Sequence, residues 1–300
     1  MLDVHAHVGD IFPRRLPIQI DQPAPPPHYL MLSSPGIEDA ARLLYRHRPP
    51  CASLGFLKHA ILTLMRRRQT LRGMVVPNLL RDMARYGISA SVALPIEYED
   101  GVDRSTAILQ ACRQFPEIIP FCSVHPKDAR WREKLDTYIA LGAQGLKIHP
   151  NLQRFAFNDR ACVDVVAAFA PSRLPIILHS GLTGRERRAR RFSDLEGFDA
   201  LPARFPNTPF VLAHAGLAQY EAAMRLAQQH ENVWLELSGQ PAQHIRRMMV
   251  VVGAERLLFG SDWPFWPQRL ALQAIRDAAD GDEAVARRIL HDNAARLLRR

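Results

Sequence analysis

The chain lacks any run of about 18 uninterrupted apolar residues, the length that a membrane-spanning helix needs, so we expect no membrane segment. Its first residues contain no basic stretch followed by an apolar one, and we therefore expect no signal peptide. Cysteine is sparse and forms no CxxC pair, since it stands only at positions 51, 112, 122 and 162. These absences predict reduced thiols in a cytoplasmic protein.

Lysine is also scarce. It stands at four positions (58, 127, 134 and 147), which leaves 35 of the 39 basic residues as arginine. A net charge of +9 raises the question of a nucleic-acid partner, but the arginines are dispersed and few aromatic side chains lie between them. We therefore expect no nucleic-acid binding, and the charge is a weak indication of an anionic small-molecule substrate.

Two glycine-based motifs are absent as well. No GxGxxG follows the opening apolar segment, which disfavours an open doubly wound sheet that binds a dinucleotide. No GxSxG elbow offers a serine nucleophile. The length of 300 residues and a hydrophobic content of 47% are instead typical of one barrel domain with an insertion.

From about residue 76, apolar β-rich runs alternate with amphipathic helical patterns such as DRSTAILQACRQF and QYEAAMRLAQQH. Seven such runs follow the opening segment: SASVALPI, IIPFCSVHP, AQGLKIHP, LPIILHSG, TPFVLAHAG, VWLELSG and RLLFGSDWPF. Apolar runs separated by helices are typical of parallel strands that helices cover on the outside. We therefore predict an α/β fold, a single (β/α)8 barrel over residues 1–300, with an extra C-terminal helix near 282–298.

The segment after the first strand differs from the rest of the chain. Residues 11–36 are rich in proline, which disfavours a regular element, and helical patterns follow near 37–48 and 54–72. Because an insertion at this point of a barrel lies beside the end that carries active sites, we predict that residues 11–72 form a cap-like insertion.

The opening strand reads DVHAH. Alternate residues of a strand share one face, so we expect Asp3, His5 and His7 to lie together, with two imidazoles able to reach one cation. Polar residues also stand at the carboxyl ends of later predicted strands: His125, His149, His179, His214 and Asp262. These ends converge at one mouth of a barrel, so the sequence predicts a divalent metal site there, for Zn²⁺, Mn²⁺ or Fe²⁺.

The motifs DVHAH, GLKIHP, ILHSG, VLAHAG and FGSDWP together resemble the amidohydrolase superfamily of metal-dependent TIM barrels. The resemblance is closest to the amidohydrolase-related branch, which includes aminocarboxymuconate-semialdehyde decarboxylases, resorcylate-type decarboxylases and several lactonases. It covers nearly the whole chain outside residues 11–72, and the closing ILHDNAARLL resembles the C-terminal segment of that branch.

This resemblance implies a role for each strand-end residue. His5, His7 and His179 would be metal ligands, and Asp262 a further ligand or the base that orients water. His214 would lie beside the water at the metal and polarise the substrate or transfer a proton. It implies one divalent ion per chain, for which we expect Zn²⁺ first, and it implies that Asp3 fixes the orientation of a ligand from within the barrel.

Lys147 and His149 share the inward face of the predicted fourth strand. In binuclear members of the superfamily a lysine on this strand is carboxylated and bridges two metals. The alternative is a buried lysine that pairs with a neighbouring carboxylate, and we favour this reading because the mononuclear branch is the closer match. Both residues are candidates for substrate binding, whereas His125 is expected only to form hydrogen bonds.

Two further stretches could contact a substrate. Five arginines between Arg185 and Arg191 could hold a carboxylate, although a solvated basic loop is the simpler reading. Trp263, Phe265 and Trp266 follow the last strand and could form an apolar wall, and we take Trp263 as the candidate. The expected substrate is therefore a small molecule, and a substrate that bears a carboxylate is one candidate.

Three functions follow as hypotheses. The first is a metal-dependent hydrolase that cleaves a C–O or C–N bond of a lactone, ester or cyclic amide with activated water. The second is a metal-dependent, non-oxidative decarboxylase of an aromatic or muconate-type acid. The third, a barrel without catalysis, is disfavoured because every expected ligand position is occupied by a suitable residue. Members of this family are often dimers, so a homodimer is possible, although no residue pattern indicates an interface.

Overall fold

The structure, a computed structural model, describes residues 1–12, 18–27, 29, 69–181 and 192–300. Most of the cap-like insertion predicted for residues 11–72 lies outside these residues, as does the arginine-rich stretch 185–191. The described residues 18–27 form neither helix nor strand, as their prolines predict. In the described part of the chain, no helix combines the length and the apolar character needed to cross a membrane.

Eight strands alternate with helices along the chain, and each predicted apolar run contains one strand. The strands are β1 (Leu2–Ala6), β2 (Ala90–Ala93), β3 (Ile118–Pro120), β4 (Leu146–Ile148), β5 (Ile176–His179), β6 (Phe210–Ala213), β7 (Val233–Glu236) and β8 (Leu257–Leu258). The main helices are α3 (Val76–Tyr86), α4 (Arg104–Ala111), α5 (Trp131–Ala140), α6 (Pro150–Gln153), α7 (Arg160–Phe169), α9 (Ala200–Arg204), α10 (Tyr220–Gln229), α11 (Ala242–Val251), α12 (Gln268–Ala279), α13 (Glu283–Arg287) and α14 (Asn293–Leu297).

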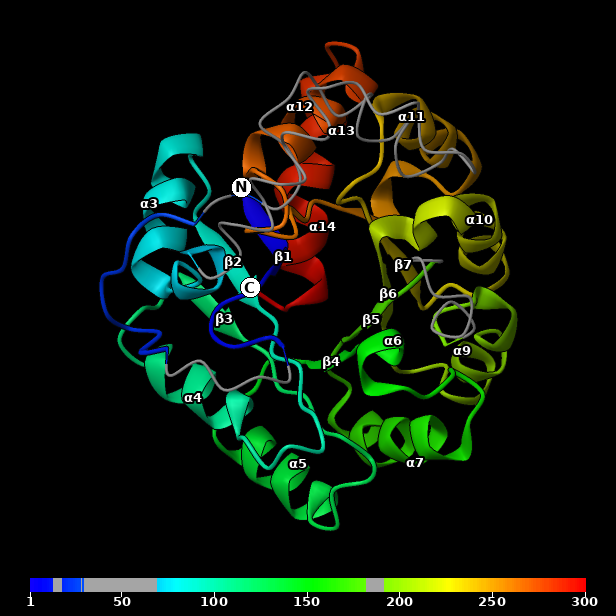
Figure 1. Ribbon diagram of the computed structural model, residues 1–300. Coiled ribbons are helices and arrows are strands. Elements are labelled where there is room, and N and C mark those ends of the chain that lie inside the picture. The colour runs from blue at the N-terminus through cyan, green and yellow to red at the C-terminus, as the bar shows by residue number, and fades with distance from the viewer. Residues whose placement is uncertain (13–17, 28, 30–68, 182–191) are drawn as a thin grey trace, which may run out of the picture.

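The strands form one ring of parallel neighbours. Two parallel sheets, β1–β2–β3 and β4–β5–β6–β7–β8, account for the regular pairing. Backbone hydrogen bonds join them at both edges: Cys122 donates to Gly145 (2.9 Å) between β3 and β4, and Val4 donates to Phe259 (2.9 Å) between β1 and β8. The helices surround this ring (Figure 1), which is the arrangement predicted from the sequence.

A bulge in β1 decides which of its residues face the barrel interior. Asp3 pairs with Ser91 and Ala6 pairs with Ala93, so β1 holds one residue more than β2 between these two pairs. An extra residue in one strand interrupts the alternation of side chains between the two faces. The HxH motif lies across this interruption.

The bulge separates Asp3 from His5 in β1 and from His7, which follows the strand. Leu2 and Val4 pack with Ile177 in the barrel interior, whereas Ala6 packs in the outer core between strands and helices. Asp3, between two inward residues, therefore points to the outer side of the strand. The prediction that it shares a face with both histidines is wrong, because a strict alternation does not hold across the bulge.

The Asp3 carboxylate instead fixes backbone. It accepts hydrogen bonds from the N–H of His5 (3.0 Å), from the N–H and hydroxyl of Ser261 (2.9 and 2.6 Å) and from Nε2 of Gln268 (3.2 Å). Its complete burial raises the pKa of Asp3 to about 7. Asp3 thus ties β1 to the segment that follows β8 and to the start of α12.

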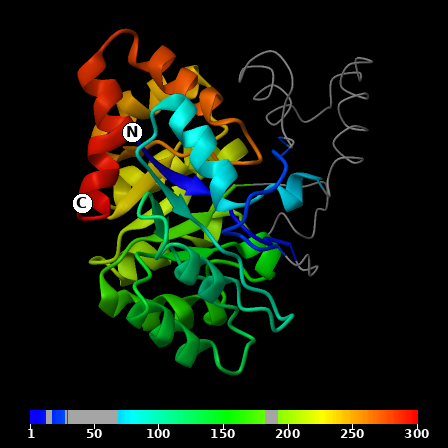
Figure 2. The same ribbon diagram turned by 90° about the vertical axis from the view of Figure 1, so that its left-hand side faces the viewer.

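The predicted C-terminal helix near 282–298 is confirmed, with a π-helical segment at Arg288–Asp292 between α13 and α14. Ala294 and Leu297 of α14 pack against Leu2 and Val4. Figure 2 shows these C-terminal helices on one side of the molecule and the described residues that follow β1 on the other. The C-terminal helix therefore lies away from the mouth, where the carboxyl ends of the strands converge.

Gly181 follows β5 directly and lies against the segment after β6. Its φ is +91°, and a Cβ at this position would lie 2.0 Å from the carbonyl oxygen of Gly216. Gly142, in the turn after α5, has a similar φ of +99°, but nothing lies within 4 Å of the position of its Cβ. Alanine substitutions at these two glycines therefore separate the cost of a left-handed backbone from the cost of a steric clash.

We expect Gly142→Ala to lower the free energy of unfolding by about 1–2 kcal/mol, the cost of a left-handed backbone for a residue with a Cβ. Gly181→Ala should lose a further ~1–3 kcal/mol, because backbone on both sides must move apart. Urea denaturation followed by circular dichroism measures both changes. Equal losses for the two variants would show that the approach of Gly181 to Gly216 is not required for stability.

Candidate metal centre

Three buried donor atoms face one another at the mouth. Nε2 of His5 lies 3.2 Å from Nε2 of His7, and Oδ1 of Asp262 lies 3.4 and 3.3 Å from these two nitrogens. Tetrahedral ligands at about 2.0–2.1 Å from a zinc ion are roughly 3.4 Å apart. The spacing of the three atoms therefore fits one divalent cation between them.

The hydrogen bonds of the two histidines determine which ring nitrogen carries the proton. Nδ1 of His7 lies 2.9 Å from the carbonyl oxygen of Leu94, and Nδ1 of His5 lies 2.7 Å from Oε2 of Glu236. Because a carbonyl and a carboxylate accept, both Nδ1 atoms donate, so each ring in its neutral form presents an unprotonated Nε2. Two imidazole lone pairs and a carboxylate oxygen thus converge, an arrangement that a cation stabilises and that is otherwise repulsive.

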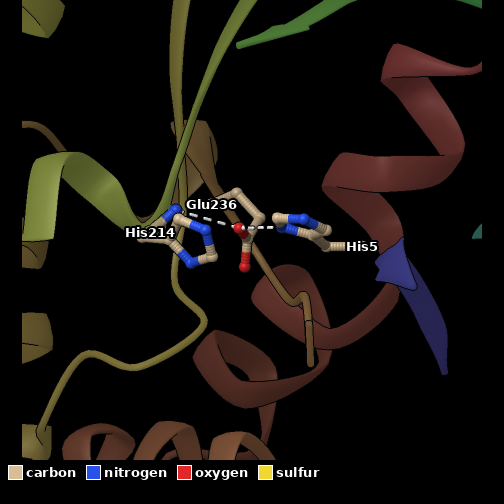
Figure 3. A group of neighbouring side chains, drawn as sticks. All are labelled: His5, His214 and Glu236. Carbon is tan, nitrogen blue, oxygen red and sulfur yellow. Dashed lines mark hydrogen bonds and ion pairs between the residues drawn. The ribbon is translucent and has the colours of Figure 1, made fainter. Parts of the chain in front are cut away.

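Glu236 organises this cluster from β7. Its carboxylate accepts hydrogen bonds from Nδ1 of His5, from the backbone N–H of His214 (3.0 Å) and from the hydroxyl (2.9 Å) and backbone N–H of Ser238. Figure 3 shows its side chain between His5 and His214. Our sequence analysis did not select Glu236, although it is the one charged residue in the apolar run VWLEL, and that exception is a usable signal.

His214 joins the same network from the end of β6. The hydroxyl of Ser238 donates to Glu236, so it accepts from Nδ1 of His214 (2.7 Å), which leaves Nε2 of His214 unprotonated. Its ring centroid lies 4.9 Å from that of His5 and 4.9 Å from that of His179. Burial lowers the pKa of His214, although Asp262 and Glu236 oppose that shift.

His179 and His149 form a stacked pair on the neighbouring strands β5 and β4. Their ring centroids are 3.9 Å apart with an interplanar angle of 9°. Burial holds the pKa of each well below its ordinary value. Of the described donor atoms that cluster within 4.8 Å of one another, none comes from His179, so its assignment as third ligand stays a prediction.

Asp262 and His214 both occupy left-handed backbone, with φ of 57° and 61°. Such conformations are costly for residues with a Cβ and are often found at functional sites. The N–H of Asp262 donates to the carbonyl of His5 (2.7 Å), which holds the carboxylate beside the two histidines. Burial raises the pKa of Asp262, but the imidazoles of His5, His214 and His7 outweigh this effect and hold it below its ordinary value.

Lys147 lies on the inward face of β4, since it pairs with Ile177 of the interior cluster. The residue is fully buried, and its Nζ has no hydrogen-bond partner among the residues that the structure describes. Burial lowers the pKa of Lys147 to about 8, with Asp262 and Glu236 acting in the opposite direction. The charges of Asp262 and Glu236 thus act on Lys147, and its pairing with a neighbouring carboxylate stays a prediction.

The aromatic candidates separate in the structure. Trp263 is fully buried, and its Nε1 donates to Asp82 (2.9 Å), so it lies outside the histidine cluster. Phe265 meets the ring of His7 edge-on at 5.7 Å between centroids. A role of Trp263 in substrate binding stays a prediction, and Phe265 is the aromatic side chain that reaches the mouth.

His125 forms hydrogen bonds with the backbone and lies 3.8 Å from a carboxylate oxygen of Glu99. Its Nε2 donates to the carbonyl of Gln153 (3.0 Å), and its Nδ1 accepts from the N–H of Lys127 (3.3 Å). Burial lowers the pKa of His125. It is therefore a structural link between the segment after β3 and the short helix α6.

A cavity of about 630 Å³ lies at the same end of the barrel, beside the residues that follow β1 and β2. Its wall includes Gly9, Asp10, Val102 and Arg104. Arg104 is already held by Asp100 (2.7 Å) and Asp10 (3.4 Å), so its charge is satisfied within the chain. None of the clustered histidines, Glu236 or Asp262 lines this cavity, so it lies apart from the candidate metal residues.

Comparisons with known proteins agree with this geometry. The amidohydrolase family model matches residues 3–300. Among curated proteins, no sequence matches this chain.

Three similar solved structures illustrate the range of relatives. An uncharacterised TIM-barrel protein from Bordetella bronchiseptica has a TM-score of 0.65 at 16% identity, covering 100% of this chain and 99% of that one. A dihydroxybenzoic acid decarboxylase from a Polaromonas species has manganese and the inhibitor 2-nitroresorcinol bound. Its TM-score is 0.62 at 16% sequence identity, and the match covers 78% of this chain and 90% of that one. A probable 2-pyrone-4,6-dicarboxylic acid hydrolase from Acinetobacter baumannii has citric acid bound. Its TM-score is 0.57 at 15% sequence identity, and the match covers 76% of this chain and 90% of that one.

At these identities the solved structures establish the fold, a TIM barrel. The family match extends over nearly the whole chain and includes both ends of the site, from the HxH motif of β1 to the aspartate after β8. This chain therefore belongs to the amidohydrolase family of metal-dependent TIM-barrel enzymes.

Proposed function

We propose that this enzyme is a hydrolase that cleaves a C–O or C–N bond of a small molecule such as a lactone, an ester or a cyclic amide. The observation that supports it most is the convergence of two unprotonated imidazole nitrogens and the Asp262 carboxylate within 3.4 Å of one another. A carboxylate at such a point can accept a proton from water that attacks a carbonyl. The low pKa of Asp262 keeps it ionised for that task.

The proposed cofactor is one divalent ion per chain, with Zn²⁺ expected first and Mn²⁺ or Fe²⁺ as alternatives. His5, His7 and Asp262 would hold it, and His179 would complete the set. When bound, such an ion lowers the pKa of water toward about 7 and polarises a carbonyl oxygen. Imidazole and carboxylate donors suit these metals, and the hydrogen bonds to both Nδ1 atoms hold the rings in the orientation that binding needs.

The chain's own residues then divide the remaining work. Asp262 accepts the proton of the attacking water, and the uncharged His214 beside it transfers a proton or orients the substrate carbonyl. His149, Lys147 and Trp263 are our candidates for substrate contacts. The buried surroundings exclude bulk water from these groups and strengthen their electrostatic interactions.

A second candidate is a non-oxidative decarboxylase of an aromatic or muconate-type acid. It is favoured by the solved decarboxylase that shares this fold and contains manganese with a resorcinol inhibitor. The same ligands would serve it. In this reaction a proton is added to the substrate carbon that loses CO₂, whereas in hydrolysis a proton is taken from the attacking water. The two reactions therefore differ in the atom that the solvent contributes to the product.

Removing both histidines of the HxH motif tests the metal site. We expect the His5→Ala/His7→Ala variant to fold but to lose its metal, because two of the three clustered donors are gone. Elemental analysis of protein purified without chelator or nickel should find about one ion per chain in the natural protein and almost none in the variant. His230→Ala, which removes a histidine bonded only to Asp199 on the surface, should keep its metal. Unchanged metal in the double variant would refute the site.

Glu236→Gln tests the support behind the site. The amide cannot accept from His5, His214 and Ser238 at once, so the rings lose their fixed orientation. We expect the metal dissociation constant, measured by competition with a chromogenic chelator, to rise about 10–100-fold. The exposed Glu231→Gln is the matched control. Equal affinities in both variants would show that Glu236 does not orient the ligands.

The isotope content of the product tests the reaction. With a panel of lactones, aryl esters, cyclic amides and hydroxybenzoic acids, hydrolysis in H₂¹⁸O places one ¹⁸O in the product. Decarboxylation in D₂O instead places deuterium on carbon and releases CO₂. Mass spectrometry of the products distinguishes them, and CO₂ release with deuterated carbon would replace our proposal by the second candidate.

Asp262→Asn should retain most of the metal while kcat falls at least about 100-fold, because the amide cannot accept the proton. The exposed Asp277→Asn should leave kcat unchanged. An Asp262→Asn variant with unaltered kcat would assign the proton transfer to His214.

A further inference from the structure

Lys147 is a fully buried ammonium group without a partner. No atom of the described residues forms a hydrogen bond with its Nζ, and the residue has no exposed surface. Burying an uncompensated charge is costly, so such a group normally has a counter-charge. The side chain of Lys147 takes no part in strand pairing, since its backbone N–H makes the hydrogen bond to the carbonyl oxygen of Cys122 (2.7 Å).

The side chain of Lys147 points from the middle of the barrel toward the mouth. It pairs with Ile177, and His179 lies two residues further along β5 on the same face, roughly 6.6 Å toward the mouth. This distance is close to the reach of the four-carbon stem of a lysine. The side chain of Lys147 therefore extends toward the level of His179 on β5.

The two carboxylates of the site do not serve as its partner. Glu236 already accepts four hydrogen bonds, from His5, His214 and Ser238. Asp262 faces the Nε2 atoms of His5 and His7. Within the described part of the chain, Nζ of Lys147 therefore has no hydrogen-bond acceptor, and a bound molecule can supply one.

We propose that Nζ of Lys147 binds a carboxylate group of the substrate, so that this site selects small organic acids in their anionic form. The inference uses the location of the active site from the proposed function, but it holds for either reaction. A carboxylate is the group of choice because it offers charge and two acceptor oxygens to a single ammonium. Two carboxylates, one ammonium and one divalent cation sum to +1, which one carboxylate of the substrate neutralises.

Benzoate and its neutral analogue benzamide are the probes. They have the same shape and differ in charge. Calorimetric titration of the metal-loaded enzyme with each one gives two dissociation constants, and their ratio measures the preference for the carboxylate without any turnover. We expect the natural protein to prefer benzoate. Lys147→Met, which keeps the length of the side chain, should lower the affinity for benzoate about 10–100-fold and change the affinity for benzamide little.

Three controls make the result specific. Lys147→Arg should keep part of the preference, since it retains the charge. Lys127→Met removes an equal charge from an exposed lysine and should bind benzoate as the natural protein does. The metal content of each variant is measured. The titrations are also repeated on metal-free protein. A preference for benzoate that depends on Lys147 in that protein cannot arise from the metal.

Two outcomes would overturn the proposal. Equal affinity of Lys147→Met and the natural protein for benzoate, at equal metal content, would show that Nζ does not bind the carboxylate. A carbamate signal at Lys147 in ¹³C NMR after growth with ¹³C-bicarbonate, with two metals per chain, would show a carboxylated metal bridge instead of an ammonium. Neither outcome depends on the isotope experiment, so the proposed reaction and this inference can fail separately.

Discussion

The hydrogen bond from Nδ1 of His5 to the Glu236 carboxylate is the interaction on which the metal centre depends. It fixes the proton on one side of the His5 ring and leaves the other nitrogen unprotonated, facing His7 and Asp262. The same carboxylate holds the backbone of His214. One buried acid on β7 therefore orients side chains on β1 and β6, so the chemistry of the site requires the barrel to be closed.

The backbone around this carboxylate is irregular where the site needs it. A bulge in β1 lies between Asp3 and Ala6, and left-handed residues occur at His214 and Asp262. Each departure is held by specific hydrogen bonds, such as those of Asp3 to Ser261 and of Asp262 to His5. The ring of parallel strands, buried on both faces, supplies the rigidity that such strained positions require.

Charge in the interior is sparse, and each charged group has a defined place. Glu236 accepts several hydrogen bonds, Asp262 lies against imidazoles, and Nζ of Lys147 has no hydrogen-bond acceptor among the described residues. A buried charge without a partner is costly. The converging donor atoms and the ammonium of Lys147 therefore indicate which ligand charges would stabilise the site. We propose that a divalent cation and an organic anion together complete it.

The sequence by itself determined the eight strands, the C-terminal helix and the gathering of histidines and Asp262 at one mouth, because local periodicity and the parallel topology suffice for these. It did not reveal that Asp3 faces outward, since the bulge arises from the pairing of β1 with β2. It also did not reveal Glu236, whose partner His5 is 231 residues away. Proton positions, orphaned charges and strand register depend on contacts between distant segments, and only the tertiary structure decided them.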